Sequence, residues 1–267
     1  MSAHRHSIGW SISGAGLAQT PADVAVVMPT ITRPALAAAL RSVFQQRFSG
    51  RIQVLVGVDR MLGDPAIIDR IAAERPEHVE MVLLNLPWST SRRHGGVHLP
   101  GDGGALRSIL SYMANAHYVA YLDDDNAWLP DHLERLHAAA QGKLWAFAHR
   151  MLVDGSTNKD LVPDRWDSVG PDKGRFAERG GFVDPNCLMV SKLLGAQLFG
   201  LWADTGIGKV SMTADRNFFR GLRARPFGEV QDPTVRYFLR PDNILWRLMQ
   251  EGSASGGDDG GAVAGGG

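Results

Sequence analysis

Strand-like and helix-like segments alternate along the first 140 or so residues, and this alternation constrains the fold of the chain more than any other feature. Short runs rich in valine, leucine and tyrosine are followed by segments whose apolar residues recur every three or four positions. The strand segments are residues 23–29, 51–59, 78–86 and 118–122, and the helical segments are residues 35–46, 65–75, 104–116 and 129–140. Such alternation builds a mostly parallel central sheet flanked by helices, so we predict an α/β fold.

The second half of the chain is less regular. Its pattern predicts strands at residues 144–153 and 181–191 and helices at residues 193–201 and 213–223. The last segment, EGSASGGDDGGAVAGGG, has too little apolar content to offset the entropy of ordering it, so we predict disorder there. We therefore divide the chain into an N-terminal extension (residues 1–21), a single domain (22–250) and a Gly-rich tail (251–267).

Composition excludes several classes of partner and site. The 28 lysines and arginines balance 28 aspartates and glutamates, so no global field attracts nucleic acid, which we do not expect as a partner. A single cysteine, Cys187, excludes an internal disulfide framework and any multi-cysteine metal site. It is interpreted as a small core residue.

The chain shows no signal of membrane insertion or export. No apolar run reaches the ~18 residues of a transmembrane helix, and the N-terminus lacks a signal-peptide pattern. We expect a cytoplasmic protein, and the sequence leaves peripheral contact with a membrane open.

Polar residues follow three of the predicted strands. Thr30 and Arg33 follow the first, Asp59 the second, and the run Asp123, Asp124, Asp125 the fourth. In open parallel sheets the ligand crevice lies beyond the carboxyl ends of the strands, so these groups are expected to converge.

The run of aspartates, in HYVAYLDDDNAWLPDHLERLH, brings like charges so close together that a metal ion, an arginine or water must lie among them. It can be a solvated turn that caps the following helix, because acidic residues favour helix starts. It can instead hold a divalent cation, because hard cations prefer carboxylate and phosphate oxygens. The cation is the better interpretation, since Asp131 already supplies an acidic first turn to that helix.

The segments VVMPTITRPALAAALRSVFQQ, LVGVD and YVAYLDDDNAWLPDHLERL, taken in this order and spacing, resemble family 2 glycosyltransferases with the A-type nucleotide-sugar-binding fold. The resemblance covers residues 22–140 well and extends loosely to about residue 237. It implies a Rossmann-like half that binds the nucleotide sugar (22–140) and a less regular half that binds the acceptor (141–250). It also implies a metal-dependent, inverting transfer of a sugar from a nucleoside-diphosphate sugar to a hydroxyl of a carbohydrate or other acceptor.

The resemblance also implies roles for individual residues. Asp59 would bind the nucleotide base, in a pocket that Pro29, Thr30 and Arg33 also line. Asp123 would lie near the ribose, Asp125 would coordinate Mn²⁺ or Mg²⁺, and Asp124 would share either role. Arg107 would face the donor, or would be a surface charge of its helix.

The acceptor base implied by the resemblance is an acidic residue that opens a late helix, commonly after a glutamate. The segment SMTADRNFFRGL offers Asp215 in this position, with Ala214 in place of the glutamate. Asp215 can alternatively start the helix together with Thr213. Asp184 and Asp204 are the next candidates for the base.

Other functions fit the sequence less well. The segment ADTGIGKV lacks the first glycine and the Ser or Thr of a P-loop, and Leu106 stands where a dinucleotide fingerprint after GDGG needs glycine. A sugar nucleotidyltransferase needs a glycine-rich basic loop after the first strand, where this chain has MPTITRPAL. A non-catalytic nucleotide-sugar or glycan-binding module of the same fold remains the strongest alternative.

The loop at residues 88–104, WSTSRRHGGVHLPGDGG, is interpreted as a mobile surface segment or as a flap that closes over the diphosphate. We expect a UDP-sugar donor, by its frequency in the family.

Overall fold

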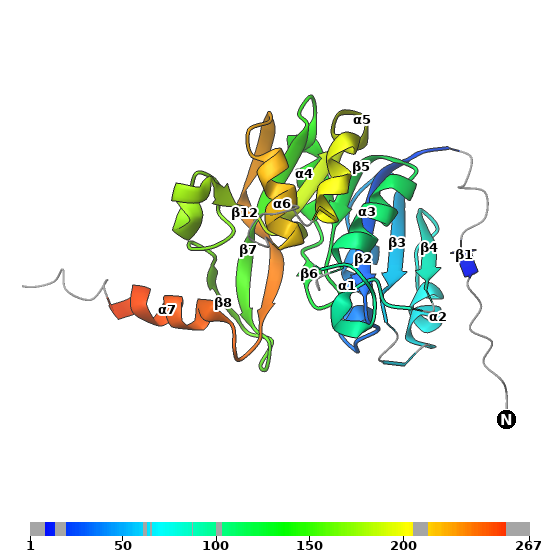
Figure 1. Cartoon of the computed structure of the whole chain (residues 1–267), viewed down its shortest axis with the longest axis horizontal. Coiled ribbons are helices and arrows are strands. Elements are labelled where there is room, and N and C mark those ends of the chain that lie inside the picture. The colour runs from blue at the N-terminus through cyan, green and yellow to red at the C-terminus, as the bar shows by residue number, and fades with distance from the viewer. Residues whose placement is uncertain are drawn as a thin grey trace, which may run out of the picture.

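The computed structural model describes residues 9–13, 20–60, 63–64, 66–86, 88–99, 103–204 and 213–254 of the 267-residue chain. One large sheet runs through the molecule in the order β1-β4-β3-β2-β5-β11-β7-β12-β6, with β8 paired to β7 (Figure 1). Its strands are β1 (Gly9–Ser13), β2 (Ala22–Thr30), β3 (Ile52–Val58), β4 (Val79–Asn85), β5 (Ala116–Tyr121), β6 (Ala127–Trp128), β7 (Trp145–Asp154), β8 (Asp160–Pro163), β11 (Leu188–Ser191) and β12 (Phe227–Leu239).

The first half of the chain forms the parallel part of this sheet. Strands β2, β3, β4 and β5 pair in parallel, and β2 lies between β3 and β5. The chain runs outward from β2 through β3 to β4 and then returns to the other side of β2 as β5. This reversal is a topological switch point, and it opens a crevice beyond the carboxyl ends of β2 and β5.

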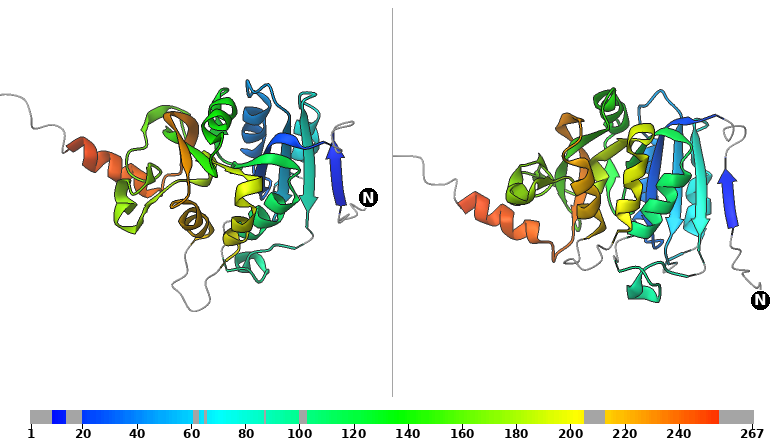
Figure 2. Two further views of the ribbon diagram at one scale, coloured as in Figure 1. Left: turned by 90° about the horizontal axis from the view of Figure 1, so that it is seen from above. Right: turned by 45° about the horizontal axis from the view of Figure 1, so that its top comes forward.

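Helices cover both faces of the parallel strands (Figure 2). Their bounds are α1 (Leu36–Phe44), α2 (Ala66–Ala72), α3 (Gly104–Met113) and α4 (His132–Ala140). Because both faces are covered, every residue of β3 is buried, as is typical of parallel sheets. The helix α1 buries Leu36, Ala39, Leu40 and Val43, the stripe that the sequence predicts.

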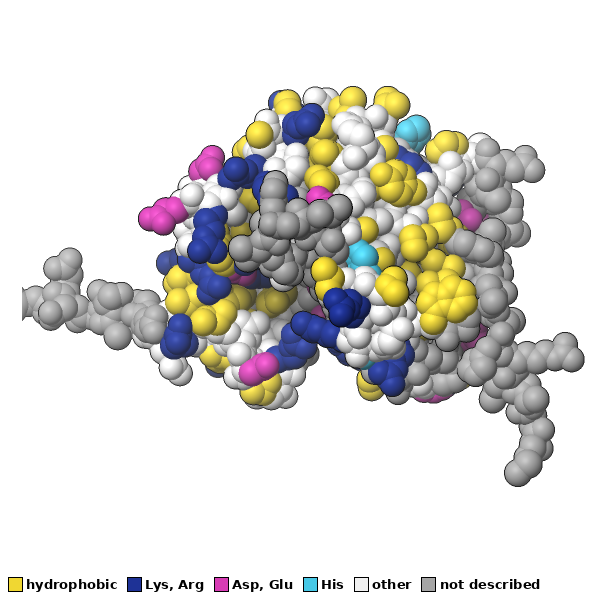
Figure 3. Space-filling model, in the orientation of Figure 1, with side chains coloured by type: hydrophobic (Ala, Val, Ile, Leu, Met, Phe, Trp, Pro, Cys, Tyr) yellow, Lys and Arg dark blue, Asp and Glu magenta, His cyan; other side chains and the backbone are white. Residues whose placement is uncertain are grey.

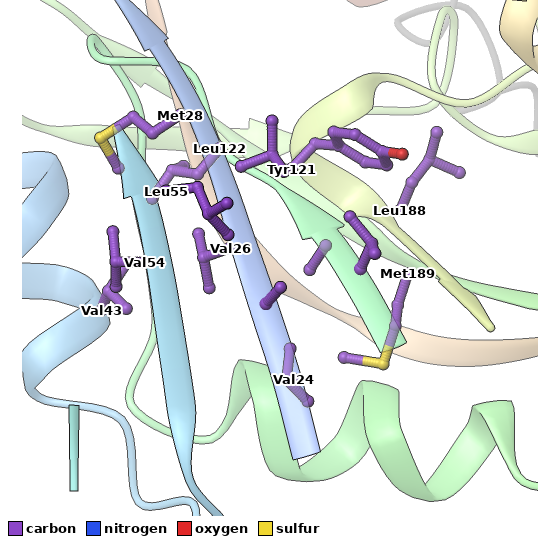
Figure 4. Packing of buried hydrophobic residues seen from close by; sticks show 14 of the residues in the cluster. Val24, Val26, Met28, Val43, Val54, Leu55, Tyr121, Leu122, Leu188 and Met189 are labelled. Carbon is purple, nitrogen blue, oxygen red and sulfur yellow. The ribbon is translucent and has the colours of Figure 1, made fainter. Parts of the chain in front are cut away.

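The core is continuous across the parallel and antiparallel parts of the sheet. Figure 4 shows side chains of β2, β3, β5 and β11 in one cluster, among them Val26, Leu55, Tyr121 and Met189. All four are at most 1% exposed. Cys187 belongs to the same buried cluster, which confirms that it is a core residue.

The second half adds antiparallel and mixed pairing. Strand β11 is antiparallel to β5 and β7, while the long strand β12 runs parallel to β7. The remaining elements are β9 (Gly170–Pro171), β10 (Gly181–Phe182), α5 (Lys192–Gly195), α6 (Ala214–Leu222), α7 (Ile244–Ala254) and the 3₁₀ turns η1 (Arg92–His94), η2 (Gly174–Arg179), η3 (Pro185–Cys187) and η4 (Ala196–Trp202).

The structure corrects two predicted elements in this half. The strand expected at residues 181–191 is broken by η3, because Asp184 caps this turn by accepting a hydrogen bond from the Asn186 amide and Pro185 follows the cap. The helix expected at residues 193–201 is a single turn, α5, that continues as the 3₁₀ segment η4. Both errors come from local hydrogen bonds that periodicity does not encode.

The chain ends also differ in detail from the prediction. Residues Gly9–Ser13 of the predicted extension form β1, which pairs antiparallel with β4. Helix α7 continues to Ala254, so the predicted start of the tail at Glu251 falls inside a helix. Residues 255–267 lie outside the described residues, and the division into domain and tail stays a prediction. Within the described part of the chain, no helix is both long and apolar enough to cross a membrane.

One histidine is buried where α4 meets the sheet. The ring of His132 is fully buried, stacks on Trp128 with ring centroids 4.4 Å apart, and its Nδ1 lies 2.7 Å from the Thr234 hydroxyl of β12. Burial disfavours the charged ring and lowers the pKa of His132 to about 3. Folding therefore requires a neutral His132.

This burial predicts a pH-dependent stability. Below pH ~6.5 the unfolded state binds a proton at His132, whereas the folded state does not. The free energy of unfolding therefore decreases as the pH falls below this value. The variant His132→Gln keeps a hydrogen-bonding side chain that does not titrate. Between pH 7.5 and pH 5.0, urea unfolding of wild type should lose about 2 kcal/mol more than that of the variant. Equal losses of unfolding free energy in wild type and variant would show that His132 has the same pKa in the folded and unfolded states.

Candidate functional site

A cavity of about 550 Å³ lies at the switch point, beyond the carboxyl ends of β2 and β5. The space-filling view shows the surface hollowed between the two halves of the molecule, with Lys and Arg side chains at the hollow (Figure 3). All the site residues predicted from the sequence line this one cavity: Pro29, Thr30, Arg33, Asp59, Arg107, Asp123, Asp124, Asp125 and Asp215. The convergence expected from the parallel topology is therefore present.

Asp124 connects the aspartate run to the loop after β2 through hydrogen bonds. Its buried carboxylate accepts hydrogen bonds from the Thr30 hydroxyl at 2.7 Å and the Ile31 amide at 3.3 Å. Burial raises the pKa of Asp124, and the Thr30 hydrogen bond and the Arg33 charge oppose that rise. The contacts of Asp124 are thus internal to the protein, and they fix the relative position of two strand ends.

Asp125 points toward the open part of the cavity. One of its oxygens lies 2.7 Å from Arg33 Nη1, and its side chain is about one-third exposed. Burial, and after it the charges of Asp123 and Asp124, raise the pKa of Asp125 to about 6. A carboxylate crowded by other carboxylates favours a nearby cation, and here the Arg33 guanidinium is that cation, so Asp125 is a candidate ligand for a metal.

Asp123 is held by one arginine and one asparagine. Arg107, itself buried in α3, forms an ion pair with the Asp123 carboxylate, so Arg107 is not a surface charge of its helix. The Asn186 side chain accepts from the Asp123 amide at 2.7 Å and donates to the Asp123 carboxylate at 2.9 Å. Asn186 was not predicted as a site residue.

The carboxylate of Asp184 lies on the far side of Asn186. One oxygen accepts from Asn186 Nδ2 at 2.6 Å, and the other lies 2.6 Å from Arg150 Nη1. Burial raises the pKa of Asp184 to about 6, the Arg150 charge opposes this rise, and the Asp123 charge adds to it. Asp184 lines the cavity, but both of its oxygens have protein partners, which argues for a positioning role rather than that of a base.

Arg150 is the centre of a buried ion-pair cluster that the sequence did not predict. Its guanidinium contacts the carboxylates of Asp164 at 2.8 Å, Asp184 at 2.6 Å and Asp167 at 3.0 Å, and lies 3.9 Å from the ring centroid of Tyr237. The three carboxylates are 14 to 34 residues away from Arg150 along the chain, so no local motif links them.

Asp59 holds the loop after β4. Its carboxylate accepts from the Ser89 hydroxyl at 2.7 Å and from the amide and hydroxyl of Thr90 at 2.8 and 2.5 Å. Arg93 and His94, a few residues farther along, line the cavity. A role of Asp59 in base binding stays a prediction, and its visible role is to position this loop.

Asp215 lies in the first turn of α6 and lines the cavity. The helix is anchored behind it by Phe218, which stacks on Trp202 with centroids 4.2 Å apart. Of the alternative bases, Asp204 is not among the described residues that line the cavity.

The charge of the cavity is unbalanced. Among the described lining residues, six carboxylates face four guanidinium groups: Asp59, Asp123, Asp124, Asp125, Asp184 and Asp215 against Arg33, Arg93, Arg107 and Arg240. In the part of the chain that the structure describes, no three His, Cys, Asp or Glu side chains form a ready metal site. A divalent cation here would depend on Asp125 and on oxygens supplied by a ligand.

No protein-family model matches the chain, and no curated protein sequence matches it either. Solved structures do. S. aureus TarS 1–349 in complex with UDP-GlcNAc is 15% identical at a TM-score of 0.57, covering 83% of this chain and 60% of that chain. The mannosyltransferase PcManGT from Pyrobaculum calidifontis, in complex with GDP-Man and Mn²⁺, is 15% identical at a TM-score of 0.56, covering 95% and 69%.

These likenesses establish the fold. The chain has the A-type nucleotide-sugar transferase fold that its sequence resemblance implies, which confirms the predicted fold class. It spans about three-fifths of the length of TarS 1–349.

The Arg150 cluster generates a stability prediction. Arg150→Met leaves three carboxylates without their common cation in a buried position, so the free energy of unfolding should fall by about 3 to 5 kcal/mol. Arg135→Met is the matched control, because Arg135 pairs with Asp131 and Asp232 at the surface, where solvent screens the charges, and its loss should change stability far less. Urea unfolding at pH 7.5 measures both. Equal effects would mean that the cluster is no more important than a surface ion pair.

Proposed function

We propose that this protein is a metal-dependent, inverting glycosyltransferase that moves a sugar from a nucleoside-diphosphate sugar to an acceptor hydroxyl. The observation that carries the proposal is the cavity at the switch point, which gathers the aspartate run, Asp59 and Asp215 in this fold. The nucleotide-sugar complexes of TarS and PcManGT support it.

The charge of the cavity supports a divalent cation. A nucleoside-diphosphate sugar brings two negative charges to a lining where carboxylates already outnumber arginines. Mn²⁺ or Mg²⁺ offsets these charges, and Asp125 is the residue proposed to hold it. Bound there, the cation would supply Lewis-acid stabilisation of the leaving diphosphate.

The remaining lining residues are assigned to the donor. Pro29, Thr30 and Arg33 lie at the end of β2 and would contact the nucleotide, together with Asp59. Arg107 orients Asp123 for the ribose, and Asn186 fixes Asp123 from the opposite side. We expect UDP as the nucleotide, while the GDP-Man complex of PcManGT makes GDP the first alternative.

Asp215 is proposed as the general base. It would accept the proton of the acceptor hydroxyl while that oxygen attacks the anomeric carbon. The new carbon–oxygen bond forms as the bond to the diphosphate breaks, and the diphosphate leaves with the electron pair. Attack from the side opposite the leaving group inverts the anomeric carbon.

The first test concerns donor binding. Asp125→Asn should abolish the metal-dependent part of the thermal stabilisation by UDP, because the neutral amide lacks the charge with which the carboxylate binds a cation.

Asp59→Ala should weaken nucleotide binding up to about tenfold with or without metal, since a hydrogen-bonding group is lost and the loop at Ser89 is released.

Asp131→Asn is the control for this test, because Asp131 lies just beyond the same segment on an exposed, paired position. Its response to UDP and Mn²⁺ should equal that of wild type. If Asp125→Asn binds the metal and nucleotide like wild type by calorimetry, the cation site is elsewhere.

The second test separates an enzyme from a binding module. Asp215→Asn keeps the size of the side chain but removes the proton acceptor, so donor binding should persist while transfer falls about 10² to 10⁴-fold. Asp204→Asn should leave transfer unchanged. Release of nucleoside diphosphate, coupled to detection of the glycosylated acceptor, measures both.

Two outcomes would contradict the assignment. Transfer by Asp215→Asn within a few-fold of wild type would move the base to another carboxylate, with Asp184→Asn as the next variant. Binding of nucleotide sugar by wild type without any transfer would favour the non-catalytic module.

A further inference from the structure

A stripe of arginines runs along α6 from the proposed base. Arg216 follows Asp215 directly, and Arg220 and Arg223 recur four and seven positions after it, which places all three on one face of the helix. Arg220 is exposed, and Arg216 and Arg223 are partly exposed. This face is therefore positively charged and open to solvent.

The segment η2 adds a second row of positive charge beside α6. Arg175 and Arg216 both stack on the ring of Phe176, with their guanidinium carbons 4.5 and 3.7 Å from its centroid. Arg216 also lies over Phe182, 4.7 Å from its centroid, and Arg223 donates to the backbone carbonyl of Arg179. Two guanidinium groups thus contact the same aromatic ring.

Carboxylates neutralise this face only in part. Arg175 lies 3.4 Å from Asp167, but Asp167 is also bound to Arg150 and so its charge is shared. Among the described residues, Arg216 and Arg223 form no ion pair within 4 Å. In Figure 3, dark-blue side chains gather, with a few magenta ones, on the left half of the face shown.

We propose that the acceptor of the sugar is an anionic molecule, whose phosphate or carboxylate groups bind the surface formed by Arg175, Arg216 and Arg223. The inference rests on the proposed glycosyl transfer, and it names the chemical class of the acceptor. Guanidinium groups bind phosphate and carboxylate through paired hydrogen bonds, and stacking on Phe176 holds two of them in place. Because Asp215 opens the same helix, an anion bound on this stripe brings a neighbouring hydroxyl toward the proposed base.

The test measures binding of fluorescein-labelled polyphosphate by anisotropy, with the donor cavity filled by UDP and Mn²⁺ so that the probe cannot bind there. Wild type should bind polyphosphate with an affinity that falls as salt is added. The double variant Arg175→Gln/Arg216→Gln should bind it at least about tenfold more weakly, since two charge-assisted contacts are lost. Labelled polygalacturonate replaces phosphate by carboxylate and identifies which group the surface prefers.

Arg70→Gln is the matched control, because Arg70 is an exposed arginine of α2 whose ion pair with Asp64 lies outside the surface. It should bind polyphosphate like wild type. Thermal stabilisation by UDP-GlcNAc or GDP-Man with Mn²⁺ should be the same in wild type and all variants, which shows that the donor cavity is intact.

The inference would be overturned if wild type and the double variant bound polyphosphate equally, or if binding were lost when the donor cavity is filled. It would also be overturned if wild type bound neutral dextran as tightly as polyphosphate, or bound single-stranded RNA more tightly than polyphosphate. Failure of the proposed function is read separately, because it would show as absence of any stabilisation by both nucleotide sugars.

Discussion

The hydrogen bond from the Thr30 hydroxyl to the buried Asp124 carboxylate is the contact on which the candidate site depends. Strands β2 and β5 are neighbours in the sheet, but the chain leaves their ends in different directions, so the backbone ladder stops there. Asp124 bridges this gap by accepting from both Thr30 and Ile31. With Asp124 committed to the interior, Asp123 and Asp125 on either side project their carboxylates into the cavity. The central aspartate of the run thus fixes the two strand ends, and all three aspartates line the same cavity.

The second half of the molecule completes the site through Asn186 rather than through a direct ion pair. The Asn186 side chain connects Asp123 to Asp184, and Asp184 leads to the buried cation of Arg150. This continuous network joins the aspartate run after β5 to strands β7 and β12. Burying so many charges is costly unless each is paired, and here each carboxylate that faces Arg150 has a partner. The network therefore links the two halves of the molecule through paired charges.

The sequence predicted the parallel half well because its strands are buried on both faces and its helices carry a single apolar stripe. The convergence of Thr30, Asp59 and the aspartate run also followed from topology, since the carboxyl ends of parallel strands share one edge. Strand β12 was missed because Pro233 and a bulge between Val230 and Val235 interrupt its pairing with β7. The contacts of Arg150 with its three carboxylates and of Asn186 with Asp123 were missed because they join segments 14 to 63 residues apart. The contacts of Asp59 with Ser89 and Thr90 show that a residue of the cavity can also hold a loop.

The proposed function requires that the cavity beyond β2 and β5 binds a nucleoside diphosphate together with a divalent cation. Anomalous diffraction from a crystal grown with Mn²⁺ and UDP tests it most directly, because manganese can be located without assumption about its ligands. We expect one anomalous peak beside the Asp125 carboxylate, with the diphosphate in the same cavity. A nucleotide bound outside this cavity, or manganese bound away from Asp125, would contradict it.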